Sequence, residues 1–105
     1  MATKEIAGQT VDVDEEGFMQ TPSQWSEDIA KTIAAENGLT DLNEKHWQVI
    51  HFMRAKHEEN GTAPTVRALG KQSGVTIKEL YSLFPKGPAK LAAKIAGIPK
   101  PRGCI

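Results

Sequence analysis

The fold of this chain is indicated most directly by Val66-Arg67-Ala68-Leu69-Gly70-Lys71-Gln72-Ser73-Gly74-Val75-Thr76-Ile77-Lys78-Glu79-Leu80-Tyr81-Ser82-Leu83-Phe84. A first short helical run covers residues 65–72, and Ser73-Gly74 interrupts it. A second run covers residues 76–84, where Thr76 is a good helix cap and Pro85 ends the helix. The stretch therefore predicts two short helices joined by a tight turn, the pattern of a helix-turn-helix.

Two longer helices are predicted before this pair. Thr21-Pro22 joins a cap candidate to a proline at the first helical position, and Gly38 ends the run. Asn43 can cap the next helix, which Asn60-Gly61 ends. Apolar residues recur at helical spacing along both runs, so both helices should face the core. These residues are Trp25, Ile29 and Ile33 in the first run and Trp47, Ile50, Phe52 and Met53 in the second.

The two ends of the chain differ from this helical middle. Residues 4–14 alternate in character around a turn at Gly8-Gln9 and predict a β-hairpin. Gly87-Pro88 opens a last helix through Ala96, and residues 98–105 follow with two prolines, which favour an extended chain. We therefore expect a mostly α fold: one globular domain over residues 1–97, with an N-terminal hairpin, and a mobile C-terminal arm over residues 98–105.

Length and composition limit the classes of protein to be considered. The chain has 105 residues, of which 39% are hydrophobic and 25% charged, the balance of a single folded domain. No run is long and apolar enough for a membrane span, and the first residues do not form a secretory signal. The sequence predicts a cytoplasmic protein that does not contact membranes.

The net charge of zero hides a strong asymmetry between the two halves of the chain. Residues 1–60 hold five Lys and Arg against twelve Asp and Glu, whereas residues 61–105 hold eight against one. The acidic cluster at residues 12–16 is expected to be a solvated surface. In the basic half, Lys86, Lys90 and Lys94 recur every four residues and share one helix face. That face is a candidate surface for a partner.

Cys104 is the candidate reactive residue. It is the single cysteine of the chain, so it cannot form an internal disulfide or a cysteine-rich metal site. Its place next to the C-terminus, after Pro99, Pro101 and Gly103, predicts a thiol carried beyond the domain on the arm. The neighbouring Lys100 and Arg102 favour the thiolate and the terminal carboxylate opposes it, by about 1 kcal/mol each in water.

Other chemistry is not indicated. His46, His51 and His57 lie five and six residues apart, a spacing that does not place them on one helix face, so they are expected to be surface or half-buried side chains. We expect no metal site and no cofactor. The helix pair leaves a DNA-binding regulator as an alternative of another class, although its second helix offers only Thr76, Lys78, Tyr81 and Ser82 as polar side chains.

Several segments together resemble the DsrC/TusE family of sulfur-relay proteins. The resemblance is strongest in residues 83–90, in Lys94-Ile95-Ala96-Gly97-Ile98-Pro99-Lys100-Pro101 and in the terminal Gly103-Cys104-Ile105. Residues 14–18, 44–47 and 63–67 look like other blocks of that family. The resemblance implies a persulfide carrier with sulfur on Cys104, acting with partners rather than as a stand-alone enzyme.

The same resemblance implies the partners and their binding residues. The implied partners are a protein sulfur donor and a protein acceptor, TusBCD-like or sulfite-reductase-like, and the chain should be a monomer or a weak dimer. The candidate partner-binding residues are Lys86, Lys90, Lys94, Lys100, Arg102 and Arg67. Arg67 enters this set because it resembles an arginine that lies near the docked arm in the family.

Two routes stay open within the family. In members of dissimilatory sulfur metabolism a second cysteine eleven residues upstream holds sulfur together with the terminal one, and this chain has Ala93 there. A one-cysteine chain looks more like the TusE type, which passes sulfur toward tRNA thiolation. The direct connection through Ser73-Gly74-Val75-Thr76, however, resembles the shorter DsrC of sulfate reducers. A DsrC-type gamma subunit associated with dissimilatory sulfite reductase is therefore the alternative function.

Overall fold

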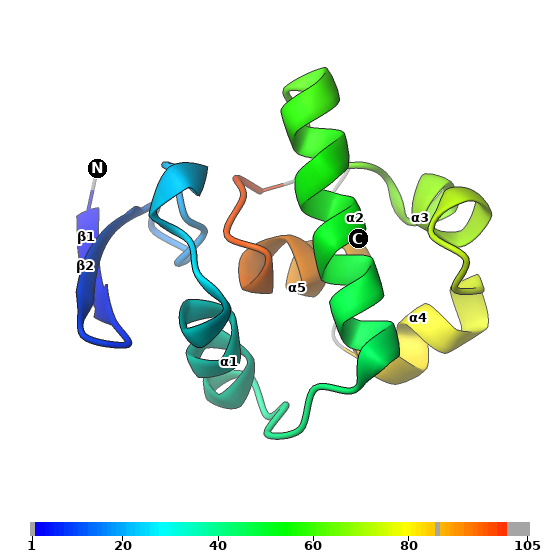
Figure 1. The fold of residues 1–105 in the computed structure, drawn as a ribbon, viewed down its shortest axis with the longest axis horizontal. Helices are drawn as coiled ribbons and strands as arrows, with labels where there is room; N and C mark the ends of the chain where they lie inside the picture. Colours follow the sequence, from blue (N-terminus) through cyan, green and yellow to red (C-terminus); the bar gives the residue numbers. More distant parts are fainter. Residues whose placement is uncertain (1, 86, 101–105) are drawn as a thin grey trace.

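A computed structural model describes residues 2–85 and 87–100 of the chain. In this part, strands β1 (Ala2–Ile6) and β2 (Gln9–Val13) form a hairpin at one end of the molecule (Figure 1). The helices follow: a 3-10 helix at Pro22–Gln24, then α1 (Glu27–Glu36), α2 (Glu44–Asn60), α3 (Val66–Gln72), α4 (Ile77–Leu83) and α5 (Pro88–Ile95). The predicted fold class, mostly α with an N-terminal hairpin, is confirmed.

The hairpin turns one residue earlier than predicted. Ile6 pairs with Gln9, so Ala7 and Gly8 form the two-residue turn, with φ of 52° and 79°. A two-residue hairpin turn that matches the twist of the strands needs positive φ at both positions, and Gly8 supplies the second at low cost. The strands extend over Ala2–Val13 rather than 4–14. Val11 and Val13 alternate toward the core, where they are buried.

The first helix begins later than predicted. Thr21 makes no capping hydrogen bond; its hydroxyl donates to the Asp12 carboxylate at 3.2 Å instead. Pro22 therefore starts only a 3-10 turn, and Trp25 is extended (φ −72°, ψ 147°). The helix itself is capped by Ser26, whose hydroxyl accepts from the Ile29 N–H at 3.3 Å. This break takes Trp25 out of the helix and leaves it free to pack against the end of α5.

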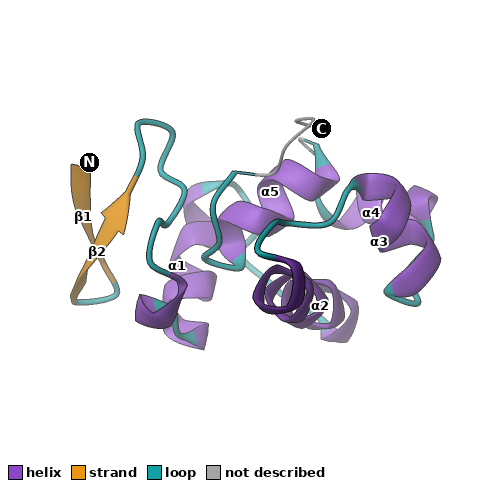
Figure 2. Ribbon diagram, turned by 90° about the horizontal axis from the view of Figure 1, so that it is seen from above, coloured by secondary structure: helices purple, strands orange, loops and turns teal. Residues whose placement is uncertain are grey.

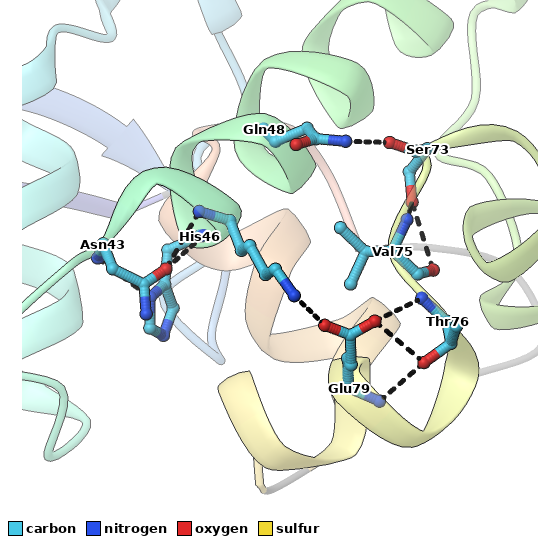
Figure 3. Close-up of polar contacts among 8 residues, drawn as sticks. Asn43, His46, Gln48, Ser73, Val75, Thr76 and Glu79 are labelled. Atoms are coloured by element: carbon cyan, nitrogen blue, oxygen red, sulfur yellow. Dashed lines mark hydrogen bonds and ion pairs between the residues drawn. The ribbon is translucent and has the colours of Figure 1, made fainter.

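The predicted ends of α2 are confirmed, but the environment of His46 is not. Asn43 caps the helix and Gly61 ends it in the left-handed conformation. His46 is only 6% exposed, whereas a surface or half-buried side chain was expected. Its Nδ1 accepts from the Asn43 N–H at 3.1 Å (Figure 3). Its Nε2 lies 3.1 Å from the Leu83 carbonyl oxygen. The ring thus completes the cap of α2 and joins that helix to α4.

The helix pair α3–α4 forms as predicted at the end of the molecule opposite the hairpin (Figure 2). Thr65 and Thr76 cap the two helices, and Glu79 completes a capping box with Thr76. The turn between them is held by the Ser73 hydroxyl, which donates to the Leu69 carbonyl and accepts from the Val75 N–H at 3.2 Å (Figure 3). Lys45 of α2 forms an ion pair with Glu79, and Gln48 donates to the Ser73 carbonyl, so α2 supports the pair from one side.

Helix α5 is the central element of the core. Most of its side chains are buried, and it lies among the other helices (Figures 1 and 2). Leu91, Ile95 and Ile98 are buried together, as predicted from their spacing. Because α5 is enclosed on nearly all sides, the direction in which the chain leaves it after Gly97 is set by the surrounding elements.

Candidate functional site

The functional site predicted from the sequence lies partly outside the described residues. Cys104, Arg102 and Lys86 belong to the segments that the structure does not describe. The structure does describe the base of the arm, residues 97–100, together with Lys90, Lys94 and Arg67. The described part of the candidate site therefore ends at Lys100, four residues before Cys104.

Trp25 and Arg54 hold the last turn of α5 in place. The Trp25 indole N–H donates to the Ile95 carbonyl oxygen at 2.9 Å. The Arg54 guanidinium donates to the Ala96 carbonyl at 2.8 Å and to the Pro22 carbonyl at 3.2 Å, and it lies 4.2 Å from the Trp25 ring centroid. The Ile95 and Ala96 carbonyls belong to the end of α5, where a helix leaves its carbonyls without intrahelical partners. One aromatic and one cationic side chain thus cap the C-terminal end of α5.

Partial burial lowers the pKa of the Arg54 guanidinium, and the charge of Glu58 opposes this shift. The group stays protonated at neutral pH, because an arginine side chain loses its proton only under strongly basic conditions. Its positive charge also lies near the negative end of the α5 dipole, where a cation is favoured. Arg54 therefore combines a hydrogen-bonding and an electrostatic role at the start of the arm.

Gly97 turns the chain away from α5. Its φ of 71° is in the left-handed region that favours glycine, and a Cβ atom at this position would lie 2.3 Å from the Trp25 ring. The Ile98 N–H then donates back to the Ala93 carbonyl at 3.2 Å, and the Ile98 side chain is only 1% exposed. Residue 98, which was predicted to begin the mobile arm, is thus packed in the core.

Glu16 forms ion pairs with two basic residues of the candidate site. Its carboxylate lies 2.7 Å from Lys100 Nζ and 3.6 Å from Lys90 Nζ. The turn that presents it is held by Asp14, whose carboxylate accepts from the N–H groups of Glu16 and Phe18 at 2.9 Å each. Residues 12–16 were expected to be a solvated surface, and Glu16 is exposed, but it links α5 to the base of the arm.

The lysine surface predicted from spacing is found in part. Lys90 and Lys94 lie on α5 and line a pocket of about 190 Å³ together with Glu16, Phe18, Asn37 and Leu91. Lys94 Nζ lies 5.6 Å from the Phe18 ring centroid. Arg67 is exposed on α3 and does not line this pocket. The structure therefore brings Lys90, Lys94 and Lys100 together and leaves Arg67 on a separate helix.

Two further pockets flank the base of the arm. One, of about 300 Å³, is lined by Pro22, Ser23, Arg54, His57, Glu58 and Ile98. The other, of about 200 Å³, is lined by His57, Gly61, Thr62, Ala63, Pro99 and Lys100. His57 borders both, at the C-terminal end of α2. Glu16, Trp25 and Arg54, whose part in the site was not predicted, all act through contacts with distant parts of the chain.

The hydrogen bond from Lys100, with smaller charge effects from both lysines, lowers the pKa of the Glu16 carboxyl from its ordinary value of 4.5. A carboxyl with a lowered pKa in the folded state stabilises the fold above its unfolded pKa, and the effect is lost as the pH falls through the folded value. We expect NMR titration of the Glu16 carboxyl carbon to give a value below 4.5. In Lys100→Gln the Glu16 pKa should rise most of the way back to 4.5, and in Lys90→Gln it should rise by less. An unchanged value in Lys100→Gln would contradict this assignment.

Comparison with known proteins places these features in a family. A family profile described as DsrC like protein matches residues 5–105. The gamma subunit of dissimilatory-type sulfite reductase from Nitratidesulfovibrio vulgaris is 39% identical over 105 residues, with 100% of each chain covered. The sulfurtransferase TusE of Yersinia pseudotuberculosis is 43% identical over 109 residues, covering 96% of this chain and 99% of TusE.

A solved structure shows the same fold. A chain in the crystal structure of dissimilatory sulfite reductase I (DsrI) matches with a TM-score of 0.87 and 40% identity, covering 99% of this chain and 100% of that chain. None of these three relatives is named as a DNA-binding protein, and within the described residues no helix has the length and apolar character needed to cross a bilayer. The sequence similarity extends over the whole chain and agrees with the fold, so the chain belongs to the DsrC/TusE family of sulfur-relay proteins.

Proposed function

We propose that this chain is a persulfide carrier that accepts sulfur on Cys104 and transfers it to an acceptor protein. The observation that supports this most is the extent of the similarity. The family profile matches through residue 105, and the Nitratidesulfovibrio vulgaris relative aligns over all 105 residues, so both include the position of Cys104. In this proposal Cys104, which follows the buried Ile98 by six residues, reaches into the partner.

The transfer itself is a thiol exchange at sulfur. The Cys104 thiolate attacks the outer sulfur of a donor persulfide and forms a new S–S bond, while the S–S bond of the donor breaks and the donor cysteine leaves as a thiolate. Delivery to the acceptor is the same step in the opposite direction. No electrons are gained or lost overall, so the chain needs no cofactor or metal for this role.

The basic residues near the arm are proposed to bind the partners. Lys90, Lys94 and Lys100 lie together on the described surface, and Lys86 and Arg102 extend the same positive region in sequence. Cations at this place attract acidic partner surfaces and stabilise the anionic persulfide. Arg67 is proposed to contribute from α3. Residues 99–105 would then act as the arm, with Ile98 as its anchor.

The donor and acceptor are proposed to be proteins of a cytoplasmic sulfur relay, TusBCD-like or sulfite-reductase-like. The alignment with TusE extends over 109 positions but uses only 96% of this chain, so TusE has several residues without a counterpart here. The alignment with the sulfite reductase subunit covers 105 residues and 100% of both chains. Ala93, fully buried on α5, stands where the resemblance leads us to expect a second cysteine in two-cysteine members. The proposed carrier therefore works with one thiol.

Loading with a persulfide donor tests the carrier function. The purified chain is incubated with a cysteine desulfurase and cysteine, desalted and weighed intact. We expect a gain of one sulfur mass that a reducing agent removes and that is absent in Cys104→Ser. A matched control, Ser82→Ala, alters another exposed side chain and should load like the original chain. Equal loading of Cys104→Ser would show that the proposed carrier residue is wrong.

The gamma-subunit alternative rests on a separate observation. The structural match with a TM-score of 0.87 is to a chain within a sulfite reductase crystal structure. If this chain also acts as such a subunit, it should co-elute with the other subunits of a dissimilatory sulfite reductase in size-exclusion chromatography. Co-elution that persists in Cys104→Ser would indicate a stable subunit, and complete separation at micromolar concentrations would exclude one.

A further inference from the structure

The outer face of the α3–α4 pair carries the two large hydrophobic side chains that are exposed in the described part of the chain. Ile77 is 44% exposed and Tyr81 is 46% exposed. They lie one turn apart on α4, so they share a face of that helix. Ile77 packs closely over α3, because a Cβ at Gly70 would lie 2.4 Å from its Cγ1 atom. The apolar surface therefore lies on α4, and Ile77 carries it up to α3 at Gly70.

Positive charges surround this apolar surface. Lys78 lies three residues before Tyr81 on α4, so the two side chains are neighbours on the helix surface. Arg67 on α3 lies three residues before Gly70 and four before Lys71. All three cations are exposed. Within residues 2–85 and 87–100, no carboxylate approaches their nitrogens to within ion-pair distance.

The one acidic residue of the pair points elsewhere. Glu79 forms an ion pair with Lys45 of α2 and accepts hydrogen bonds from Thr76 (Figure 3). It therefore supports the capping of α4 and does not neutralise the outer face. Figures 1 and 2 show that no other described element covers the outside of α3 and α4. The face is apolar at its centre, cationic at its edge and open.

We propose that this face, Arg67, Lys71, Ile77, Lys78 and Tyr81, is a docking surface for a partner protein with acidic residues around an apolar patch. An apolar centre with an exposed tyrosine and a charged rim is the usual composition of a protein interface. The charge selects an acidic partner. A DNA contact fits less well, since the exposed side of α4 offers no Arg, Asn or Gln that could read bases.

This inference rests on the proposed function for the identity of the partner, the sulfur donor or acceptor. It assigns to the partner a second contact, separate from the arm and from the lysines near Glu16. A partner held at α3–α4 would keep Cys104 near its own reactive sulfur for repeated attempts at transfer. Docking would then contribute through effective concentration, without any chemistry at this face.

Binding measurements in a Cys104→Ser background test the proposal without covalent capture. The probes are purified TusBCD complex and the remaining subunits of the Nitratidesulfovibrio vulgaris sulfite reductase, each measured by biolayer interferometry. We expect Tyr81→Ser and Lys78→Glu each to weaken binding of at least one probe by about tenfold. Tyr81→Phe, which keeps the aromatic surface, should bind within about twofold of the background chain, as should Lys31→Glu on the distant, exposed surface of α1.

The outcomes separate this proposal from the carrier function. Normal binding by Tyr81→Ser and Lys78→Glu would overturn it, as would failure of the background chain to bind either probe. Salt-sensitive binding of duplex DNA alone, or self-association that Tyr81→Ser abolishes, would identify another occupant and also overturn it. Loss of persulfide loading with intact patch-dependent binding would contradict the carrier function and leave the docking surface supported.

Discussion

Gly97→Ala should lower the free energy of unfolding by about 2–5 kcal/mol, one of the two largest stability losses we expect from a single substitution in this chain. Two costs add at this position. Alanine at a φ of 71° is strained, and its Cβ would lie 2.3 Å from the Trp25 ring, inside van der Waals contact. Trp25 cannot move away freely, because its indole N–H is bonded to the Ile95 carbonyl. Urea unfolding followed by circular dichroism measures the loss.

Gly61→Ala is the matched control for this substitution. Gly61 has nearly the same φ, 76°, but a Cβ there would meet no atom within 4 Å. It should therefore cost only the strain of the backbone, about 1 kcal/mol. The difference between the two variants isolates the close approach of the chain to Trp25. Equal losses in Gly97→Ala and Gly61→Ala would mean that Trp25 does not restrict the base of the arm.

Arg54→Ala should lower the free energy of unfolding by about 2–4 kcal/mol. The substitution removes the hydrogen bonds to the Ala96 and Pro22 carbonyls and the contact with the Trp25 ring. Hydrogen bonds from a charged donor contribute more than neutral ones, and the Ala96 carbonyl would lose its partner, whereas the Pro22 carbonyl keeps the Trp25 N–H. Residues 97–100 would also lose the contact that fixes the end of α5. We therefore expect a lower rate of persulfide transfer to a partner in addition to the lower stability.

Two variants control for the charge and for the guanidinium. Arg54→Lys keeps the charge but cannot hold both carbonyls with one ammonium group, so it should recover only part of the stability. Arg67→Ala removes an exposed arginine and should change the free energy of unfolding by less than about 0.5 kcal/mol. If Arg54→Ala is no more destabilised than Arg67→Ala, the proposed cap of α5 contributes nothing.

The helices with local signals were predictable. Asn43, Thr65 and Thr76 each accept backbone N–H bonds within three residues, and Gly61 ends α2, so the information for these boundaries lies in neighbouring positions. Thr21 shows why such signals fail. It has the chemistry of a cap, but its hydroxyl is bonded to Asp12, nine residues away, and the helix starts at Glu27. The hydrogen bond to Asp12 competes with capping, so Thr21 starts a 3-10 turn and not the α-helix.

The candidate site was predictable only in part for the same reason. Cys104 and the lysines were identified from their positions in sequence, and Lys90, Lys94 and Lys100 do lie together. Glu16 was assigned to a solvated surface because its partner Lys100 is 84 residues away. The burial of His46 depends on the Leu83 carbonyl, 37 residues along the chain. No spacing rule connects residues that far apart.

The amino-acid order alone thus determined the helical class, most helix ends, the contrast between an acidic and a basic half, and a single thiol at the end of the chain. The helices and their ends depend on hydrogen bonds and periodicities that close within a few residues, whereas the charge contrast and the thiol follow from residue identity alone. Only the tertiary structure decided how residues 95–100 are held: Trp25 and Arg54 bind the α5 carbonyls, Ile98 lies in the core, and Glu16 lies beside Lys100. Those contacts form when distant segments pack together, because only then do buried carbonyls and neighbouring charges find their partners.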